Sequence, residues 1–294
     1  MQEMMKIFSD ARKEAIQKAK NFHLAEEIRI TSGGICLYAE GKTEVLPDLI
    51  SQKEISAILS RACEYSVYAV QPQLTQGFVT IRGGHRIGVA GRAAMDGQKL
   101  SAITEISALC IRIARDRPMA AESLLPIVLS EGQVKSTLLI GRPGSGKTTC
   151  LRSLAYLLGG VQYGKKVVVI DSRGELASMY LGMPQLSVGA FTCVLDRFPK
   201  TEAIEHAVRA LAPDVIVTDE LGGSADAAAA LGALTAGVSL LASVHGEHFH
   251  HVRENRHLLP LLQSGLMRQG VFLSSRRRPG TVERVITDMT KGIL

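Results

Sequence analysis

The sequence predicts an α/β fold in which a smaller mixed α+β domain precedes a mainly parallel sheet between helices. Residues 1–115 alternate short strands with glycine turns and helices. From Ser136 onward, short apolar strands alternate with helical segments, which is typical of a parallel sheet covered by helices. A glycine-rich turn joins the first of these strands to a helix. We therefore divide the chain into residues 1–115 and residues 116–294.

Periodicity and turn signals predict the elements of the first domain. The segment from Met1 to about Lys20 is predicted to be a charged amphipathic helix, and Ser51–Ser66 places its apolar residues on one stripe of a second helix. The pair Gly83–Gly84 between alternating segments predicts a hairpin, because both glycines can take positive φ. The expected strands are Glu27–Thr31, Ile35–Glu40, Phe78–Arg82, His85–Ala90 and Ala108–Ala114.

The second domain is expected to begin with a helix from Pro118 toward Leu129. An uncharged stretch, Ala227–Val244, approaches the length of a membrane span, but Gly237 divides it into a buried helix and a core strand. A hairpin across Arg278–Gly280 is expected to close the chain. The expected strands are Ser136–Ile140, Lys166–Ile170, Asp214–Thr218, Val238–Val244, Val271–Ser275 and Thr281–Thr287.

Composition narrows the class of protein. Apolar residues make up 46% and charged residues 21% of the chain, the balance of an ordinary globular protein. The net charge of +6 fits contact with nucleic acid, anionic lipid or nucleotide phosphates, and equally a solvated basic surface. Five scattered cysteines without CxxC spacing predict reduced thiols in a cytoplasmic protein. The absence of tryptophan leaves few stacking platforms for single-stranded nucleic acid, so no nucleic-acid partner is expected.

The segment Gly141-Arg-Pro-Gly-Ser-Gly-Lys-Thr148 fits the phosphate-binding loop pattern at every fixed position. A strand precedes it and the helix Lys147–Leu158 follows, so backbone N–H groups and the positive helix end can surround phosphates. Lys147 would reach the β- and γ-phosphates, and the Thr148 hydroxyl would ligate Mg²⁺. The sequence therefore predicts a nucleoside triphosphatase that binds ATP and Mg²⁺. The expected nucleotide contacts are Gly141, Arg142, Pro143, Gly144, Ser145, Gly146, Lys147, Thr148 and Thr149.

A second motif, Asp214-Val-Ile-Val-Thr-Asp-Glu220, delivers two carboxylates at the end of an apolar strand. Asp219 can hold Mg²⁺ through water, and Glu220 is placed to orient or deprotonate the attacking water. A carboxylate directly after the magnesium one favours the RecA-like branch, which has an added strand between the two motifs. We expect Lys166–Ile170 to supply that strand.

A third polar group follows the strand Val238–Val244. His245 is the candidate sensor of the γ-phosphate, which makes it a third catalytic candidate beside Lys147 and Glu220. The nearby histidines 248, 250 and 251 keep a plain surface histidine as the alternative. No carboxylate or cysteine spacing accompanies this cluster to indicate a metal.

Two further groups of charged residues have open assignments. Asp171, Arg173 and Glu175 follow the strand Lys166–Ile170, where they either reach the γ-phosphate or cap the next helix. For Arg276–Arg278, a solvated hairpin tip is favoured over an arginine finger.

Several segments resemble a known family. Ala212–Glu220 and Thr235–His245 are similar to the magnesium-site and histidine-box segments of bacterial secretion ATPases of the type II and type IV kind. Four further segments make the resemblance more specific. Together they resemble the stage III sporulation protein AA family, the secretion-type ATPases of endospore-forming bacteria. The resemblance spans nearly the whole chain. The four further segments are Gly83–Arg92, Ile111–Arg115, Val194–Lys200 and Pro279–Glu283.

The resemblance implies a hexameric ring ATPase that drives a secretion-like channel between mother cell and forespore. It also implies membrane-protein partners in that channel and a cytoplasmic place at the inner face of the membrane. The chain departs from the family at Phe191 and Cys193, where an arginine and an aspartate are usual. Gly222 and Gly223 stand where secretion ATPases have an arginine–aspartate pair. These departures keep an ATP-binding scaffold with little turnover as an alternative. A RecA-like nucleic-acid motor is a second alternative, which the net charge of +6 would tolerate.

Arginines of the first domain have two possible roles. In a ring, some of them would face the γ-phosphate of the adjacent protomer and stabilise charge during transfer. Alternatively, they only solvate a strand surface. The arginines concerned are Arg82, Arg86, Arg92, Arg112 and Arg115.

Overall fold

The computed structural model describes residues 1–66, 70–274 and 277–290. The chain forms two compact units, and the sequence-based prediction of a mainly parallel α/β core with a separate α+β part is confirmed. The first unit comprises Met1–Arg115 and Ser178–Gln185, and the second comprises Asp116–Ala177 and Leu186–Leu294. The segment Ser178–Gln185, which the sequence-based division places in the second domain, thus makes its contacts in the first unit.

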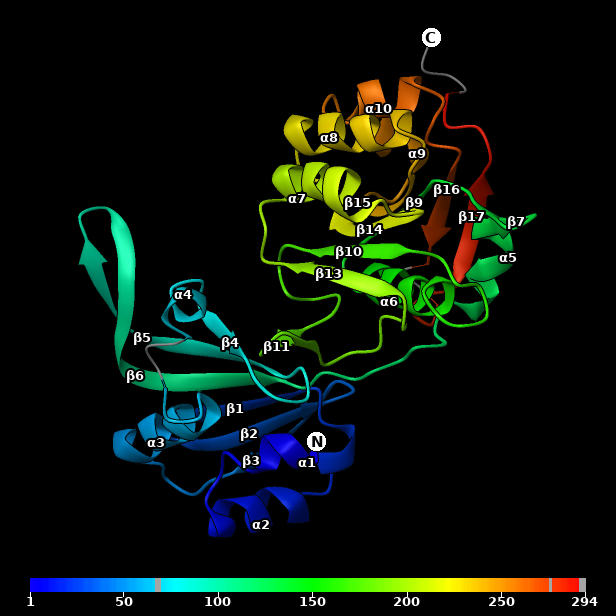
Figure 1. Cartoon of the computed structure of the whole chain (residues 1–294). Helices are drawn as coiled ribbons and strands as arrows, with labels where there is room; N and C mark the ends of the chain where they lie inside the picture. Colours follow the sequence, from blue (N-terminus) through cyan, green and yellow to red (C-terminus); the bar gives the residue numbers. More distant parts are fainter. Residues whose placement is uncertain (67–69, 275–276, 291–294) are drawn as a thin grey trace. The chain divides into compact units, whose positions relative to one another are not determined.

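The first unit contains a six-stranded antiparallel sheet in the order β3-β2-β1-β6-β5-β4 (Figure 1). Helix α3 begins after Ser51, whose hydroxyl accepts the N–H of Glu54, and it buries an apolar face in this unit's core. The strands are β1 Glu27–Thr31, β2 Gly34–Ala39, β3 Lys42–Leu46, β4 Phe78–Thr80, β5 Arg86–Asp96 and β6 Lys99–Arg112, with the short pair β11 Met179–Tyr180 and β12 Met183–Pro184. The helices are α1 Gln2–Met5, α2 Asp10–Lys18, η1 Phe22–Leu24, α3 Gln52–Ala62 and α4 Gln71–Leu74.

The hairpin predicted at Gly83–Gly84 is confirmed, because β4 and β5 pair antiparallel and both glycines have positive φ, +87° and +78°. The single helix predicted for residues 1–20 is wrong. Ile7 and Phe8 are buried between α1 and α2, and Ser9 is extended before the second helix begins. Strand β3 and the far half of the β5–β6 hairpin, which extends past the other strands in Figure 1, were not predicted.

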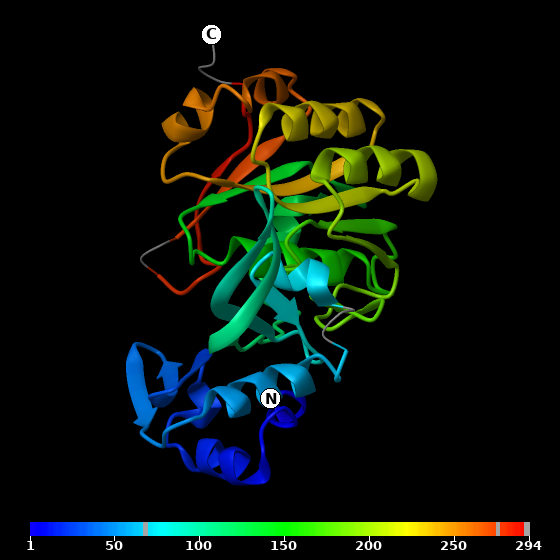
Figure 2. The same ribbon diagram turned by 90° about the vertical axis from the view of Figure 1, so that its left-hand side faces the viewer.

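The second unit contains a seven-stranded sheet in the order β13-β10-β14-β15-β9-β16-β17, with only β17 antiparallel to its neighbour. Alternate residues of the six parallel strands enter two apolar cores, one beneath α7, α8 and α10 and the other beneath α5 and α6 (Figures 1 and 2). The strands are β9 Thr137–Gly141, β10 Val167–Asp171, β13 Thr192–Asp196, β14 Val215–Glu220, β15 Ser239–His245, β16 Gln269–Leu273 and β17 Val282–Ile286, with the short pair β7 Leu129–Ser130 and β8 Gln133–Val134. The helices are η3 Glu122–Leu124, α5 Leu125–Val128, α6 Lys147–Leu158, α7 Lys200–His206, η4 Ala207–Leu211, α8 Ser224–Thr235, α9 Phe249–Glu254 and α10 Leu259–Gln263.

Two expectations for this unit need correction. The helix predicted from Pro118 to Leu129 is only the short pair η3 and α5, because Pro126 has no N–H and lies in the first turn of α5. The strand between the two motifs in the sheet is β15, whereas β10, the predicted candidate, lies on the other side of β14. The closing hairpin is confirmed as β16–β17, although Ser275 and Arg276 lie outside the described residues.

The uncharged stretch divides as predicted. Helix α8 ends at Thr235, Gly237 has a φ of +86°, and β15 begins at Ser239. Across the part of the chain that the structure describes, no helix has the length and apolarity needed to cross a bilayer.

Candidate functional site

The glycine-rich loop lies between β9 and α6, where the sequence predicts it. Gly146 caps α6 in the left-handed region with a φ of +94°, and Gly144 has a φ of +76°. A Cβ at Gly144 would meet nothing within 4 Å, so this side of the loop is open. A Cβ at Gly146 would lie 2.7 Å from the nitrogen of Gly280, whose N–H donates to the Ser145 carbonyl at 2.8 Å. The backbone at Gly280, just before β17, therefore packs against the loop at Ser145 and Gly146 and leaves the side at Gly144 open.

Lys147 folds back over this loop. Its ammonium donates to the carbonyl oxygens of Gly141 at 2.7 Å and of Arg142 at 2.9 Å. Burial lowers the pKa of Lys147, and the nearby Glu220 carboxylate acts in the opposite direction. The ammonium is thus close to both the loop and the acidic end of β14.

The end of β14 carries the two predicted carboxylates. The side chain of Asp219 is buried, and burial raises its pKa, while an ion pair with the Lys200 ammonium at 2.6 Å acts in the opposite direction. Glu220 is half-buried and lies level with Ser243 of the neighbouring strand β15. Both acids face the same pocket as the loop.

His245, the last residue of β15, lies level with Gly141 at the start of the loop. Its side chain is exposed and lines the pocket. Arg142 instead forms an ion pair with Glu247, which raises the pKa of Arg142 and lowers that of Glu247. Across the described ranges, no group of three or more histidine, cysteine or acidic residues is placed to hold a metal by itself.

The pocket has a volume of about 560 Å³ and brings most of the predicted residues together. Gly141, Arg142 and Ser145 do not line it, because Gly141 and Ser145 are buried and Arg142 pairs with Glu247. The sequence did not predict Arg117 as part of this site. It also gave Pro279 no role here, although Pro279 begins the segment Pro279–Glu283, which resembles the family. The lining residues are Arg117, Pro143, Gly144, Gly146, Lys147, Thr148, Thr149, Arg173, Glu175, Asp219, Glu220, Ser243, His245 and Pro279.

The open assignment of Asp171 is decided by its contacts. Its carboxylate accepts the backbone N–H groups of Glu175 at 2.7 Å, Leu176 at 3.0 Å and Ala177 at 2.8 Å. No helix follows β10 here, so the carboxylate stabilises an irregular turn rather than capping a helix. Asp171 does not line the pocket, whereas Arg173 and Glu175 of the same turn do.

The arginines of the first unit have partners inside that unit. Arg86 lies over the Phe78 ring at 3.7 Å, and Arg92 pairs with Glu105 at 2.6 Å. Arg112 is 3.7 Å from Glu27, and Arg115 donates to backbone carbonyls of residues 23 and 25. These contacts give each of the four arginines a partner within its own unit, and a role toward a neighbouring protomer stays a prediction.

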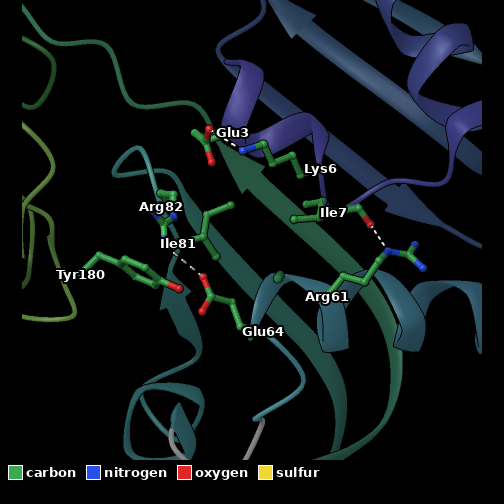
Figure 3. Close-up of a pocket in the computed structure, with 9 residues that line it drawn as sticks. Glu3, Lys6, Ile7, Arg61, Glu64, Ile81, Arg82 and Tyr180 are labelled. Carbon is green, nitrogen blue, oxygen red and sulfur yellow. Dashed lines mark hydrogen bonds and ion pairs between the residues drawn. The ribbon is translucent and has the colours of Figure 1, made fainter.

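The first unit also has a hollow of about 350 Å³ (Figure 3). Lys6 pairs with Glu3 at 2.7 Å, and Arg82 lies 3.6 Å from Glu64. Burial, with a hydrogen bond to Glu64, raises the pKa of Tyr180 to about 12. The remaining cation of the lining, Arg61, donates to the main-chain carbonyl of Ile7. The charged groups of the hollow therefore already have partners within it.

Comparison with known proteins places the chain in a family. The family described as "Sporulation stage III, protein AA" matches residues 1–293. Stage III sporulation protein AA of Bacillus subtilis is 34% identical over an alignment that covers 97% of this chain and 94% of that protein. The chain belongs to the stage III sporulation protein AA family. The resemblance found in the sequence is thereby confirmed.

The chain is similar in fold to solved ATPases. The ATPase DotB of Yersinia pseudotuberculosis matches with a TM-score of 0.61 at 14% identity, covering 90% of this chain and 76% of DotB. The pilus retraction motor PilT, solved with bound ADP, matches with a TM-score of 0.57 at 16% identity and the same coverage, 90% and 76%. At these identities the likeness concerns the fold.

Proposed function

We propose that this chain is a Mg²⁺-dependent ATPase that drives a secretion-like channel during sporulation. The observation that carries the proposal is the pocket where Lys147 and Thr148 meet Asp219 and Glu220. A phosphate-binding loop and a strand-end acidic pair on one pocket are the parts that nucleotide hydrolysis needs. Membership of the sporulation family and the secretion-ATPase fold support the channel role.

The residues present fit ATP and Mg²⁺. The open side of Gly144 leaves room for phosphate oxygens to approach the backbone N–H groups of the loop. Thr148 and Asp219 would hold Mg²⁺, which supplies positive charge against the β- and γ-phosphates. Hard oxygen donors of this kind are the ligands that Mg²⁺ prefers.

The chain's own groups then divide the chemistry. Lys147 exchanges its two carbonyl acceptors for phosphate oxygens, since its ammonium already lies over the loop. Glu220 orients the attacking water and accepts its proton. His245, on the strand between the loop strand and β14, contacts the γ-phosphate.

The proposal extends to assembly and location. It places six copies in a ring at the mother-cell side, peripheral at the inner face of the membrane and bound to membrane proteins of the stage III sporulation channel. The ring is what the family resemblance of the sequence implies, and the structure of PilT with ADP supports nucleotide binding in this fold.

Calorimetric titration of ATP into the Lys147→Ala protein tests the nucleotide site. Binding should be abolished because the loop loses its one mobile charge on the phosphates, while the exposed Lys166→Ala control should bind normally. Near-parental affinity in Lys147→Ala would refute the assignment.

The dependence of the ATPase rate on protein concentration tests assembly. The rate per protomer should rise with protein concentration if sites are shared between copies, and a constant rate argues for independent protomers.

A further inference from the structure

Lys200 makes two contacts with the acidic end of β14. It is the first residue of α7, directly after Pro199. Its ammonium lies 2.6 Å from Oδ1 of Asp219 and also donates to the main-chain carbonyl of Glu220. Only 9% of the Lys200 side chain is exposed, so the pair is shielded from solvent. One cation therefore binds the side chain of one candidate residue and the backbone of the next.

The strand end that Lys200 contacts is irregular. Val217 is level with Leu241 of β15, but Glu220 is level with Ser243, so β14 has one extra residue over this interval. Such a bulge changes the direction in which the side chains at a strand end point. The ladder is locally disrupted at a bulge, and Lys200 adds two contacts at this strand end.

Lys200 reaches these acids from outside the pocket. Asp219 and Glu220 line the pocket, whereas Lys200 is not among its lining residues. The ammonium thus contacts the carboxylate without lining the pocket, so it can fix orientation without occupying the nucleotide space. An ammonium offers three donors and no acceptor, which suits a carboxylate oxygen and a carbonyl on adjacent residues.

We propose that Lys200 is a positioning residue that holds Asp219 and Glu220 in the orientation needed for a metal-bound nucleotide. The inference rests on the proposed function, since it assigns a partner to that same site. Groups that orient a metal ligand through a second contact are commonly needed for metal affinity. The segment Val194–Lys200, which carried part of the family resemblance, then has a role at the site.

The test compares Lys200→Met, which removes the charge at similar length, with Lys200→Arg and with the exposed control Lys166→Met. Calorimetry measures the affinity for a non-hydrolysable ATP analogue, first with EDTA and then with Mg²⁺. In Lys200→Met, the EDTA affinity should stay parental, because the loop is untouched. The affinity with Mg²⁺ should fall about 10- to 100-fold, the usual range for such second contacts. Lys200→Arg should fall less, because it keeps the charge but spreads it over a planar fork.

Each other outcome overturns the inference. Parental Mg²⁺-dependent affinity in Lys200→Met shows that Asp219 needs no positioning, and a tighter affinity shows that Lys200 competes with the metal. Equal losses with EDTA and with Mg²⁺ indicate a structural role alone. If Lys200→Met does not fold, Lys200→Arg decides, and parental Mg²⁺ dependence there overturns the inference. If the parental chain itself binds no nucleotide, the proposed function fails together with the inference. If the parental chain binds nucleotide and only the Lys200 variants give an unexpected result, the inference alone fails.

Discussion

Two neighbouring strands of the second unit each have a buried aspartate at their carboxyl end, Asp171 as the last residue of β10 and Asp219 as the residue before the last of β14, yet the two carboxylates have different partners. The carboxylate of Asp171 accepts three backbone N–H groups from its own turn and does not line the pocket. The carboxylate of Asp219 lines the pocket and pairs with an ammonium from α7. In sequence, both are simply acids after an apolar strand.

The difference shows that the partner, rather than the strand-end position, decides what such an acid can do. A carboxylate already bound by backbone amides has little capacity left for a ligand, and breaking those bonds costs stability. A carboxylate held on one side by a lysine keeps another side for the pocket. We therefore expect the same substitution at the two positions to affect different properties.

Asp219→Asn should have the largest effect on turnover. Loss of the charge that faces the phosphates and Mg²⁺ should reduce the ATPase rate roughly 10²- to 10³-fold, the scale for removing one preorganised electrostatic contact. ATP affinity in EDTA should remain, since the loop is unchanged. Steady-state turnover with calorimetry measures both. An Asp219→Asn protein with the parental rate would place the metal contact elsewhere.

Glu220→Gln should reduce turnover by roughly 10²-fold, the scale of lost general-base help, and keep nucleotide binding. The amide preserves the size of the side chain but cannot accept the proton of water. Single-turnover hydrolysis separates this loss from slow product release. If hydrolysis persists at the parental rate, Glu175 is the next candidate, because it lines the same pocket.

The site was predictable where a local pattern fixes it. The loop from Gly141 to Thr148 carries its own geometry, since the spacing of its glycines and Lys147 matches one backbone shape. The strands β9, β10, β14 and β15 were predicted because buried parallel strands are continuously apolar. These elements need only neighbouring residues to be recognised.

Long-range contacts were not predictable in the same way. The ion pair of Lys200 with Asp219 depends on how α7 lies beside β14, which no local pattern encodes. For Asp171 the sequence left two roles open, reaching the γ-phosphate and capping a helix. Its actual partners are backbone N–H groups of an irregular turn, and no sequence pattern indicates such a turn. The segment Ser178–Gln185 makes its contacts in the first unit through the Gln185 amide oxygen, which accepts the N–H of Gly83 at 2.8 Å.

Asp171→Asn should change stability. The amide keeps one acceptor oxygen, so at least one backbone N–H loses its charged partner, at a cost of about 2 kcal/mol. Urea unfolding followed by circular dichroism measures the loss. The matched control is Asp214→Asn, an exposed carboxylate that accepts one N–H from Lys166, and it should cost less. Unchanged stability in Asp171→Asn, with reduced turnover instead, would reverse the contrast drawn with Asp219.

Asp196 at the end of β13 offers the smallest and most specific test, because it lies level with Asp171 but lacks its amide partners. Its Oδ1 atom is buried and has no hydrogen-bond partner among the residues that the structure describes, and Arg197 is 3.7 Å from Oδ2. Burial raises the pKa of Asp196, Arg197 opposes this shift and Asp171 adds to it. The pKa of the Asp196 carboxyl is thus higher in the folded chain than in the unfolded chain. Its contribution to the free energy of unfolding is therefore present in full at low pH, and it is lost as the pH rises through the folded-state pKa.

Asp196→Asn removes that loss, so the variant should be more stable than the parent at pH 7. The advantage should vanish as pH falls below the unfolded value of about 3.9, where both side chains are neutral. Urea unfolding at several pH values measures the difference, with Asp214→Asn as the exposed control. A destabilised Asp196→Asn at every pH would mean that the carboxylate has a stabilising partner after all. A gain confined to neutral pH would establish three strand-end aspartates with three separate roles, each decided by what contacts the carboxylate.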